Sequence, residues 1–161
     1  MWRLAVLALV LTGCGAGAGG EHACTLIAAV VGISVDLAPP IAEKTASATV
    51  EACWANTCRT HPLDLAPASK AGPQTCTGTG PDAACSAQSI PTGGKHGVVT
   101  VPDLPETPVQ VTVTLTEPGG RTGTKKLTAT PVMAHPNGPD CGGGGPQLNL
   151  AVDASGTLVT R

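Results

Sequence analysis

Cysteine and histidine are the residue types in this chain that are best suited to chemistry, because they can bind metals, act as nucleophiles or form disulfides. The 161 residues include seven cysteines and four histidines, namely Cys14, Cys24, Cys53, Cys58, Cys76, Cys85, Cys141, His22, His61, His96 and His135. Zinc sites usually contain short-range ligand pairs such as C-x-x-C or H-x-x-x-H. Neither spacing occurs in the sequence. We therefore expect no metal and no other cofactor.

The common catalytic motifs are also missing. The chain contains no G-x-S-x-G sequence, which marks many serine hydrolases. The run Gly93-Gly94-Lys95-His96 lacks the first glycine and the final Ser/Thr of a phosphate-binding loop, so it indicates a turn. The remaining candidates for ligand contact are His96, His135 and Asp140. An enzyme or a metal carrier would require these three to converge in space, and we expect no catalytic residue.

The N-terminus carries a pattern that resembles the lipobox of bacterial lipoproteins. Arg3 precedes an apolar run from Leu4 to Leu11, and the small residues Thr12 and Gly13 stand directly before Cys14. The resemblance implies that residues 1–13 are a lipoprotein signal peptide and that Cys14 receives a lipid carrying fatty acyl chains such as palmitate. A conventional signal with an ordinary thiol at Cys14 is the alternative. The resemblance places the protein on the outer face of the cytoplasmic membrane, with the lipid bilayer as a partner.

Lipidation of Cys14 would leave six cysteines, an even number that indicates three disulfides in an oxidising compartment. Strand alternation places Trp54 inward and Cys53 outward, so a two-residue turn at Ala55-Asn56 would bring Cys53 opposite Cys58. A bulge in that strand would reverse the orientation. A turn-rich segment separates Cys76 from Cys85 and favours a second bridge. Cys24–Cys141 follows by elimination, although six cysteines allow fifteen connectivities.

The hydrophobic pattern after the signal predicts an all-β domain. Val109, Val111, Val113 and Leu115 alternate with polar residues, which is typical of a half-buried strand. Further strands are expected at 33–37, 46–54, 59–65, 97–101, 125–132, 147–152 and 157–160. Residues 14–23 are expected to form a Gly/Ala tether, and residues 24–161 to form a seven- to eight-stranded sandwich stapled by disulfides. Residues 69–95 lack strand patterning and are predicted to be a long disulfide-stapled loop.

Two further resemblances support this interpretation. Residues 97–105, followed by the strand that starts at Val109, resemble part of a prealbumin-like or immunoglobulin-like sandwich. More of the chain is similar to uncharacterised small secreted lipoproteins of high-GC Gram-positive bacteria. The matching segments are Cys53-Trp54-Ala55-Asn56-Thr57-Cys58, residues 73–85, residues 91–97 and residues 136–142. These resemblances imply a location and a fold, and they carry no activity.

Composition narrows the function further. The formal net charge is −2 and no basic patch is apparent, so we expect no nucleic-acid partner. Phe and Tyr are absent, and Trp54 is the only aromatic residue after the signal. It is expected to fill the core, although a lone indole could also stack on a sugar. The sequence therefore predicts a non-catalytic binding or structural module of the cell envelope, whose partner is an envelope protein or glycan. The alternative is an accessory envelope enzyme or metal carrier.

Overall fold

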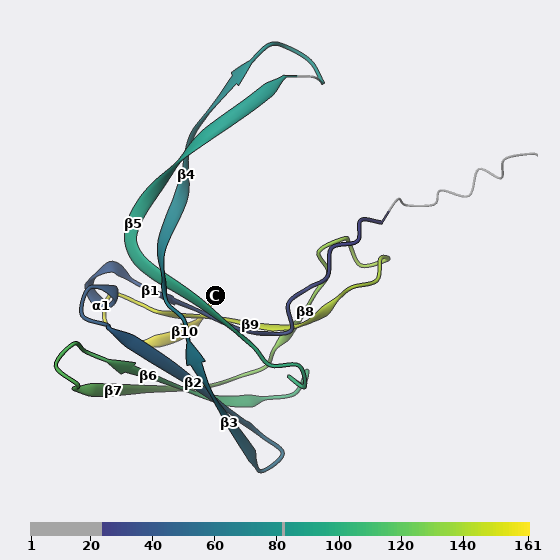
Figure 1. Ribbon diagram of the computed structural model, residues 1–161. Helices are drawn as coiled ribbons and strands as arrows, with labels where there is room; N and C mark the ends of the chain where they lie inside the picture. Colours follow the sequence, from purple (N-terminus) through teal and green to yellow (C-terminus); the bar gives the residue numbers. More distant parts are fainter. Residues whose placement is uncertain (1–23, 82) are drawn as a thin grey trace, which may run out of the picture.

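The computed structural model describes residues 24–81 and 83–161 (Figure 1). Three predictions lie outside the described residues: the signal peptide at 1–13, the lipidated Cys14, and the tether at 14–23. The described residues form ten strands and one short helix. In chain order these are β1 (Gly32–Leu37), α1 (Pro39–Ala42), β2 (Ser47–Trp54), β3 (Thr57–Leu63), β4 (Ala66–Thr77), β5 (Ala84–Thr100), β6 (Val109–Thr116), β7 (Thr122–Ala129), β8 (Val132–Ala134), β9 (Gly145–Val152) and β10 (Leu158–Thr160).

The strands form two sheets that face each other across a common core (Figure 1). The larger sheet has the order β10–β9–β1–β5–β4, with β8 paired to β9, and the smaller sheet has the order β3–β2–β6–β7. Neighbouring strands are antiparallel, except that β1 and β9 run parallel. The all-β sandwich is therefore confirmed. The strand number is ten because the predicted loop contains strand and because residues 130–131 interrupt the predicted strand at 125–132.

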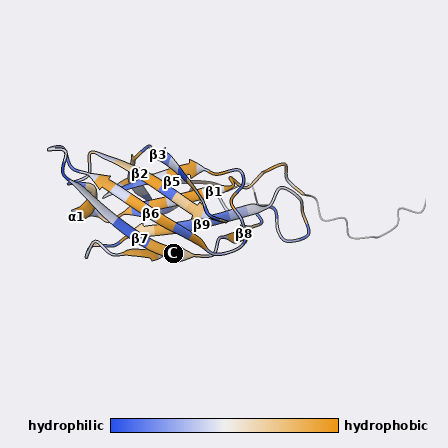
Figure 2. Cartoon of the chain, turned by 90° about the horizontal axis from the view of Figure 1, so that it is seen from below, coloured by the Kyte–Doolittle hydropathy of each residue, from blue (hydrophilic) through white to orange (hydrophobic). Residues whose placement is uncertain are grey.

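The core between the sheets is built from aliphatic side chains. Its fully buried large members are Ile33, Val35, Val50, Val101, Val109, Val111, Val113, Leu150 and Val152. Hydrophobic and hydrophilic segments alternate along the strands, as expected when one face of each sheet is buried (Figure 2). Trp54 is partly buried and packs against the edge of this core. The guanidinium carbon of Arg59 lies 5.7 Å from the centre of its ring, and the Arg59 guanidinium also binds Asp103.

Three cysteine pairs lie at disulfide distance, and they are the three pairs expected from the sequence. The Cα–Cα distances are 5.7 Å for Cys24–Cys141, 4.1 Å for Cys53–Cys58 and 4.0 Å for Cys76–Cys85. Cys53 pairs with Cys58 across the β2–β3 hairpin, and Trp54 pairs with Thr57 beside it. All six cysteines of the described residues are therefore used.

The segment predicted to be a loop at 69–95 is instead a β-hairpin. The prediction was wrong because β4 and β5 pair from Ala66 to Thr77, and their outer parts project from the sandwich as a curved arm (Figure 1). Most side chains of the arm are exposed on both faces, so the sequence shows no alternation of apolar and polar residues. Backbone hydrogen bonds hold the arm together, and Cys76–Cys85 closes its tip. The arm comprises residues 68–81 and 83–92 in the text below.

Removal of the tip disulfide should disorder the arm and leave the sandwich intact. A two-stranded hairpin without a buried face is marginally stable in water, so the arm depends on its covalent closure. In a C76S/C85S variant we expect hydrogen–deuterium exchange to lose protection in the arm. The free energy of unfolding of the core should change by less than about 0.5 kcal/mol. An equal loss of protection in β6 and β9 would contradict this independence of arm and core.

Candidate functional site

The outer face of the larger sheet carries a row of polar side chains at its centre. Along β1, Ser34 and Asp36 alternate with the buried residues Ile33, Val35 and Leu37, so they point away from the core. Cross-strand pairing extends this polar face to both neighbours. On β5, His96 pairs with Asp36 and Val98 pairs with Ser34. On β9, Ala151 pairs with Asp36 and Asn149 pairs with Ser34.

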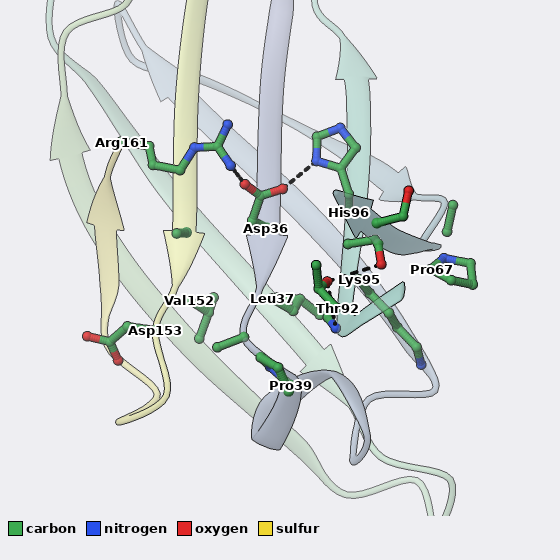
Figure 3. Close-up of a pocket in the computed structure, with 16 residues that line it drawn as sticks. Asp36, Leu37, Pro39, Pro67, Thr92, Lys95, His96, Val152, Asp153 and Arg161 are labelled. Atoms are coloured by element: carbon green, nitrogen blue, oxygen red, sulfur yellow. Dashed lines mark hydrogen bonds and ion pairs between the residues drawn. The ribbon is translucent and has the colours of Figure 1, made fainter. Parts of the chain in front are cut away.

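Asp36 joins the side chains of His96 and Arg161 on this face. One carboxylate oxygen lies 2.5 Å from Nδ1 of His96, and the other accepts a hydrogen bond from the guanidinium of Arg161. Arg161 follows β10, and its backbone N–H donates to the carbonyl of Asn149 at 2.9 Å. Figure 3 shows the imidazole and the guanidinium on opposite sides of the carboxylate. The cluster Asp36–His96–Arg161 thus connects β1, β5 and the end of β10.

The cluster fixes the arrangement of protons on His96. An ionised carboxylate can only accept hydrogen bonds, so Nδ1 of His96 carries the proton that faces Asp36. Nε2 has no partner among the described residues. The His96 side chain is 42% exposed, which leaves Nε2 accessible to a ligand. A neutral ring would accept a hydrogen bond at Nε2, whereas a protonated ring would donate one.

Two adjoining hollows meet at this cluster, because His96 and Arg161 line both of them. The larger has a volume of about 570 Å³, and the base of the arm forms one wall. Its apolar lining includes Leu37, Ala38, Pro39, Ala66, Pro67, Ala68, Ala151 and Val152. The smaller has a volume of about 280 Å³ and contains the polar residues Ser34, Gln147 and Asn149. A polar end and an apolar chamber therefore lie side by side on one surface.

The other charged residues of the larger hollow are engaged within the protein. Nζ of Lys95 donates to the carbonyl of Thr45 at 2.6 Å. Asp153 accepts hydrogen bonds from the hydroxyl of Ser155 and from the backbone N–H groups of Thr157 and Ser155. The hydroxyl of Ser155, followed by the backbone of Thr157, lowers the pKa of Asp153 below its usual value, so its carboxyl stays ionised. Both groups therefore hold turns in place at the rim.

Only one of the three candidates named from the sequence lies at this site. His96 lies in the cluster, whereas His135 and Asp140 lie in the segment between β8 and β9 and line neither hollow. That segment is tied to the N-terminal residues by Cys24–Cys141 and by a hydrogen bond from Asn137 to the carbonyl of Ile27, which hold it at another part of the molecule. The three side chains therefore do not form one site.

Asp36 and Arg161 were missed by the sequence analysis. In the sequence, Asp36 is one of many polar residues expected on the outward face of a strand. Arg161 follows it by 125 positions (161 − 36 = 125). The strand alternation gave the only available signal, since it placed Asp36 on the outer face.

One group of three potential metal-ligand atoms lies within 4.8 Å among the described residues: Glu51, Cys53 and Cys58. Both of its sulfur atoms are joined in the Cys53–Cys58 disulfide, so they are not thiolate ligands in this state.

Within residues 24–81 and 83–161, no helix has the length and hydrophobicity needed to cross a bilayer. Comparisons with protein-family models, with curated proteins and with solved structures gave no match to the chain. Its function must therefore be inferred from its own residues and their geometry.

Proposed function

We propose that this chain is a lipid-anchored extracytoplasmic lipoprotein that acts as a non-catalytic binding module of the cell envelope. The observation that carries the anchor is the pairing of the cysteines. All six cysteines of the described residues lie in three disulfides, so only Cys14, the cysteine of the lipobox-like sequence, is left over. Disulfides persist in oxidising compartments outside the cytoplasm, which is where lipoproteins reside.

Exposed apolar side chains close to the expected anchor support a membrane partner. Leu26 is fully exposed, and more than half of the surface of Ile27, Val30 and Val132 is exposed. The chain around them is held in place, because Ala29 donates to the carbonyl of Gly143 and the Asn137 amide donates to the carbonyl of Ile27. Apolar side chains fixed in water are unfavourable, whereas the surface of a bilayer would cover them. Leu26, at this end of the domain, follows Cys14 by twelve positions in the sequence.

The geometry of the hollow supports binding rather than catalysis. Both carboxylate oxygens of Asp36 are occupied by His96 and Arg161. The hydroxyl of Ser34, on the same strand face, donates to Asn149 at 2.7 Å and not to His96. A nucleophile hydrogen-bonded to its base is the arrangement required for nucleophilic catalysis, and it is missing from this cluster. The open hollow with an apolar chamber is the kind of surface that holds a ligand.

The anchor is tested by replacing the cysteine that would carry the lipid. In bacteria grown with an alkynyl palmitate analogue, we expect the wild-type chain to incorporate the label and a C14S variant to fall to background, a loss of at least about tenfold. Mass spectrometry of the N-terminal peptide should show the acyl mass on Cys14 alone. A C53S/C58S variant is the matched control, since it removes two cysteines and should label as strongly as the wild type.

Two results would overturn the proposed location. One is equal labelling of the wild type and the C14S variant. The other is recovery of the wild-type chain in the cytosol with cysteines that react with maleimide.

A further inference from the structure

The polar end of the two hollows has the chemistry to hold an anion. We infer that it binds the carboxylate of a ligand between His96 and Arg161, and that the apolar part of the same ligand occupies the larger hollow. This inference rests on the proposed function, since it names the ligand class of the proposed binding site. Binding of the carboxylate would depend only on the hydrogen-bond donors of the site, and its test does not require the lipid anchor.

The site presents spare hydrogen-bond donors to a ligand. Each carboxylate oxygen of Asp36 already has one partner, His96 on one side and Arg161 on the other. The guanidinium of Arg161 carries five N–H donors, and Asp36 is its only partner among the described residues. Asn149 accepts from Ser34 through Oδ1, and the N–H groups of its amide have no partner within residues 24–81 and 83–161. A ligand that fits these groups must bring acceptors.

The charges of the cluster match a single negative charge. With a protonated His96 ring, the two cations exceed the Asp36 carboxylate by one charge. A carboxylate would neutralise that excess, and the planar fork of Arg161 fits its two oxygens. The balance therefore favours a carboxylate.

The larger hollow selects what is attached to the carboxylate. Its lining of alanine, proline, leucine and valine side chains favours an aliphatic group. Its lining contains no Phe, Tyr or Trp, so a sugar would find no large aromatic ring to stack on there. The volume of about 570 Å³ has room for an aliphatic amino-acid side chain next to a carboxylate. The ligand class is thus an aliphatic carboxylic acid of the kind found at the C-terminus of a peptide.

The test uses the full chain in detergent micelles and two probes that differ in one group. N-acetyl-L-leucine carries the carboxylate, and N-acetyl-L-leucinamide replaces it with a neutral amide. In ligand-observed NMR titrations at pH 5.5, we expect the acid to bind at least about tenfold more tightly than the amide. R161Q and H96Q variants should each weaken binding of the acid by about tenfold. Equal binding of the acid and the amide would overturn the inference.

The matched controls carry the same side chains away from the site. Arg121 binds a carboxylate, that of Glu117, on an exposed turn, and His135 lies outside both hollows. R121Q and H135Q variants should bind the acid as the wild type does. A loss as large in these variants as in R161Q and H96Q would overturn the site. Binding of inorganic phosphate through His96 and Arg161, without binding of the acid, would overturn the ligand class.

Binding of the acid should also weaken as the pH rises. Nε2 donates a hydrogen bond to an anion only when the ring carries a second proton, and a rise in pH removes that proton. The charged groups around His96 are Asp36 on β1, Arg161 after β10, and Lys95 and Asp153 at the rim of the hollow. A wild-type affinity at pH 8 that is several-fold weaker than at pH 5.5, with a flat profile in H96Q, supports the inference. An equal pH dependence in H96Q would overturn the role of this ring.

The failure of this inference is distinguishable from the failure of the proposed function. Labelled Cys14 with no binding of the acid would remove only the ligand class. Binding of the acid together with equal labelling of the wild type and the C14S variant would remove only the anchor.

Discussion

Replacement of Gly32 by alanine is expected to lower the free energy of unfolding by more than about 3 kcal/mol. Gly32 begins β1 and lies between Thr100 on β5 and Gln147 on β9. A Cβ atom at this position would lie 2.1 Å from the carbonyl oxygen of Val99, and that oxygen belongs to the backbone. The strand cannot accept the methyl group unless β1 and β5 separate. Chemical denaturation followed by far-UV circular dichroism would measure the loss.

Gly123 provides the control for this substitution. It lies in β7, and a Cβ atom added there would have no neighbouring atom within 4 Å, so alanine has room. A G123A variant should keep the stability of the wild type within about 0.5 kcal/mol, or gain slightly, because alanine restricts the unfolded chain more than glycine does. If G32A and G123A unfold at the same denaturant concentration, the close packing of β1 against β5 is wrong.

The sandwich could be predicted because most of its strands bury one face. Along Val109–Thr116 the apolar residues recur at every second position, and the structure places a strand at these residues. The same alternation set the orientation of Cys53 and predicted its pairing with Cys58. The turn between them is formed by Ala55 and Asn56, whose φ angles of 46° and 61° lie in the left-handed region. Local pattern was therefore sufficient wherever a face was buried.

The arm could not be predicted from the same signal. Its strands have no buried face, so the sequence carries neither apolar alternation nor a run of β-branched residues. Register shifts also occur beside Pro67 and between Ala71 and Gln74, which break the period that remains. What the sequence did show was the pair Cys76 and Cys85, whose bridge closes the tip. A strand held by backbone hydrogen bonds and one disulfide has no hydrophobic signature.

The candidate site could not be predicted from the sequence for a different reason. His96 was named because histidine is rare and reactive, whereas Asp36 and Arg161 belong to types that are common on any surface. Their contact depends on β1 lying between β5 and β9 and on β10 pairing with β9, which is a property of the topology. His135 and Asp140 were named by residue type alone, and the topology places them elsewhere. Residue type identifies candidates, and strand order decides which of them meet.

Loss of the Cys24–Cys141 bridge is expected to cost more stability than loss of either other bridge. This bridge closes a loop with a sequence separation of 117, against 5 for Cys53–Cys58. In the chain-entropy model, a loop of that length stabilises by about 4–5 kcal/mol, and the short hairpin loop by about 2 kcal/mol. The long loop contains β1 to β8, and the bridge restricts this part of the chain when the sandwich unfolds. A C24S/C141S variant should therefore show the lowest midpoint in guanidinium denaturation.

The C53S/C58S variant is the matched control for this prediction, because it removes the same number of cysteines. Backbone contacts remain in both variants, among them the bond from Ala29 to Gly143 and the bond from the Gln147 amide to Val30. If these contacts fix residues 24–31 without help from the bridge, C24S/C141S will unfold at the wild-type midpoint, above that of C53S/C58S. That result would mean that the effect of the long bridge is confined to the N-terminal segment. A lower midpoint for C24S/C141S, by an amount that tracks loop length, would show that the bridge constrains the whole sandwich.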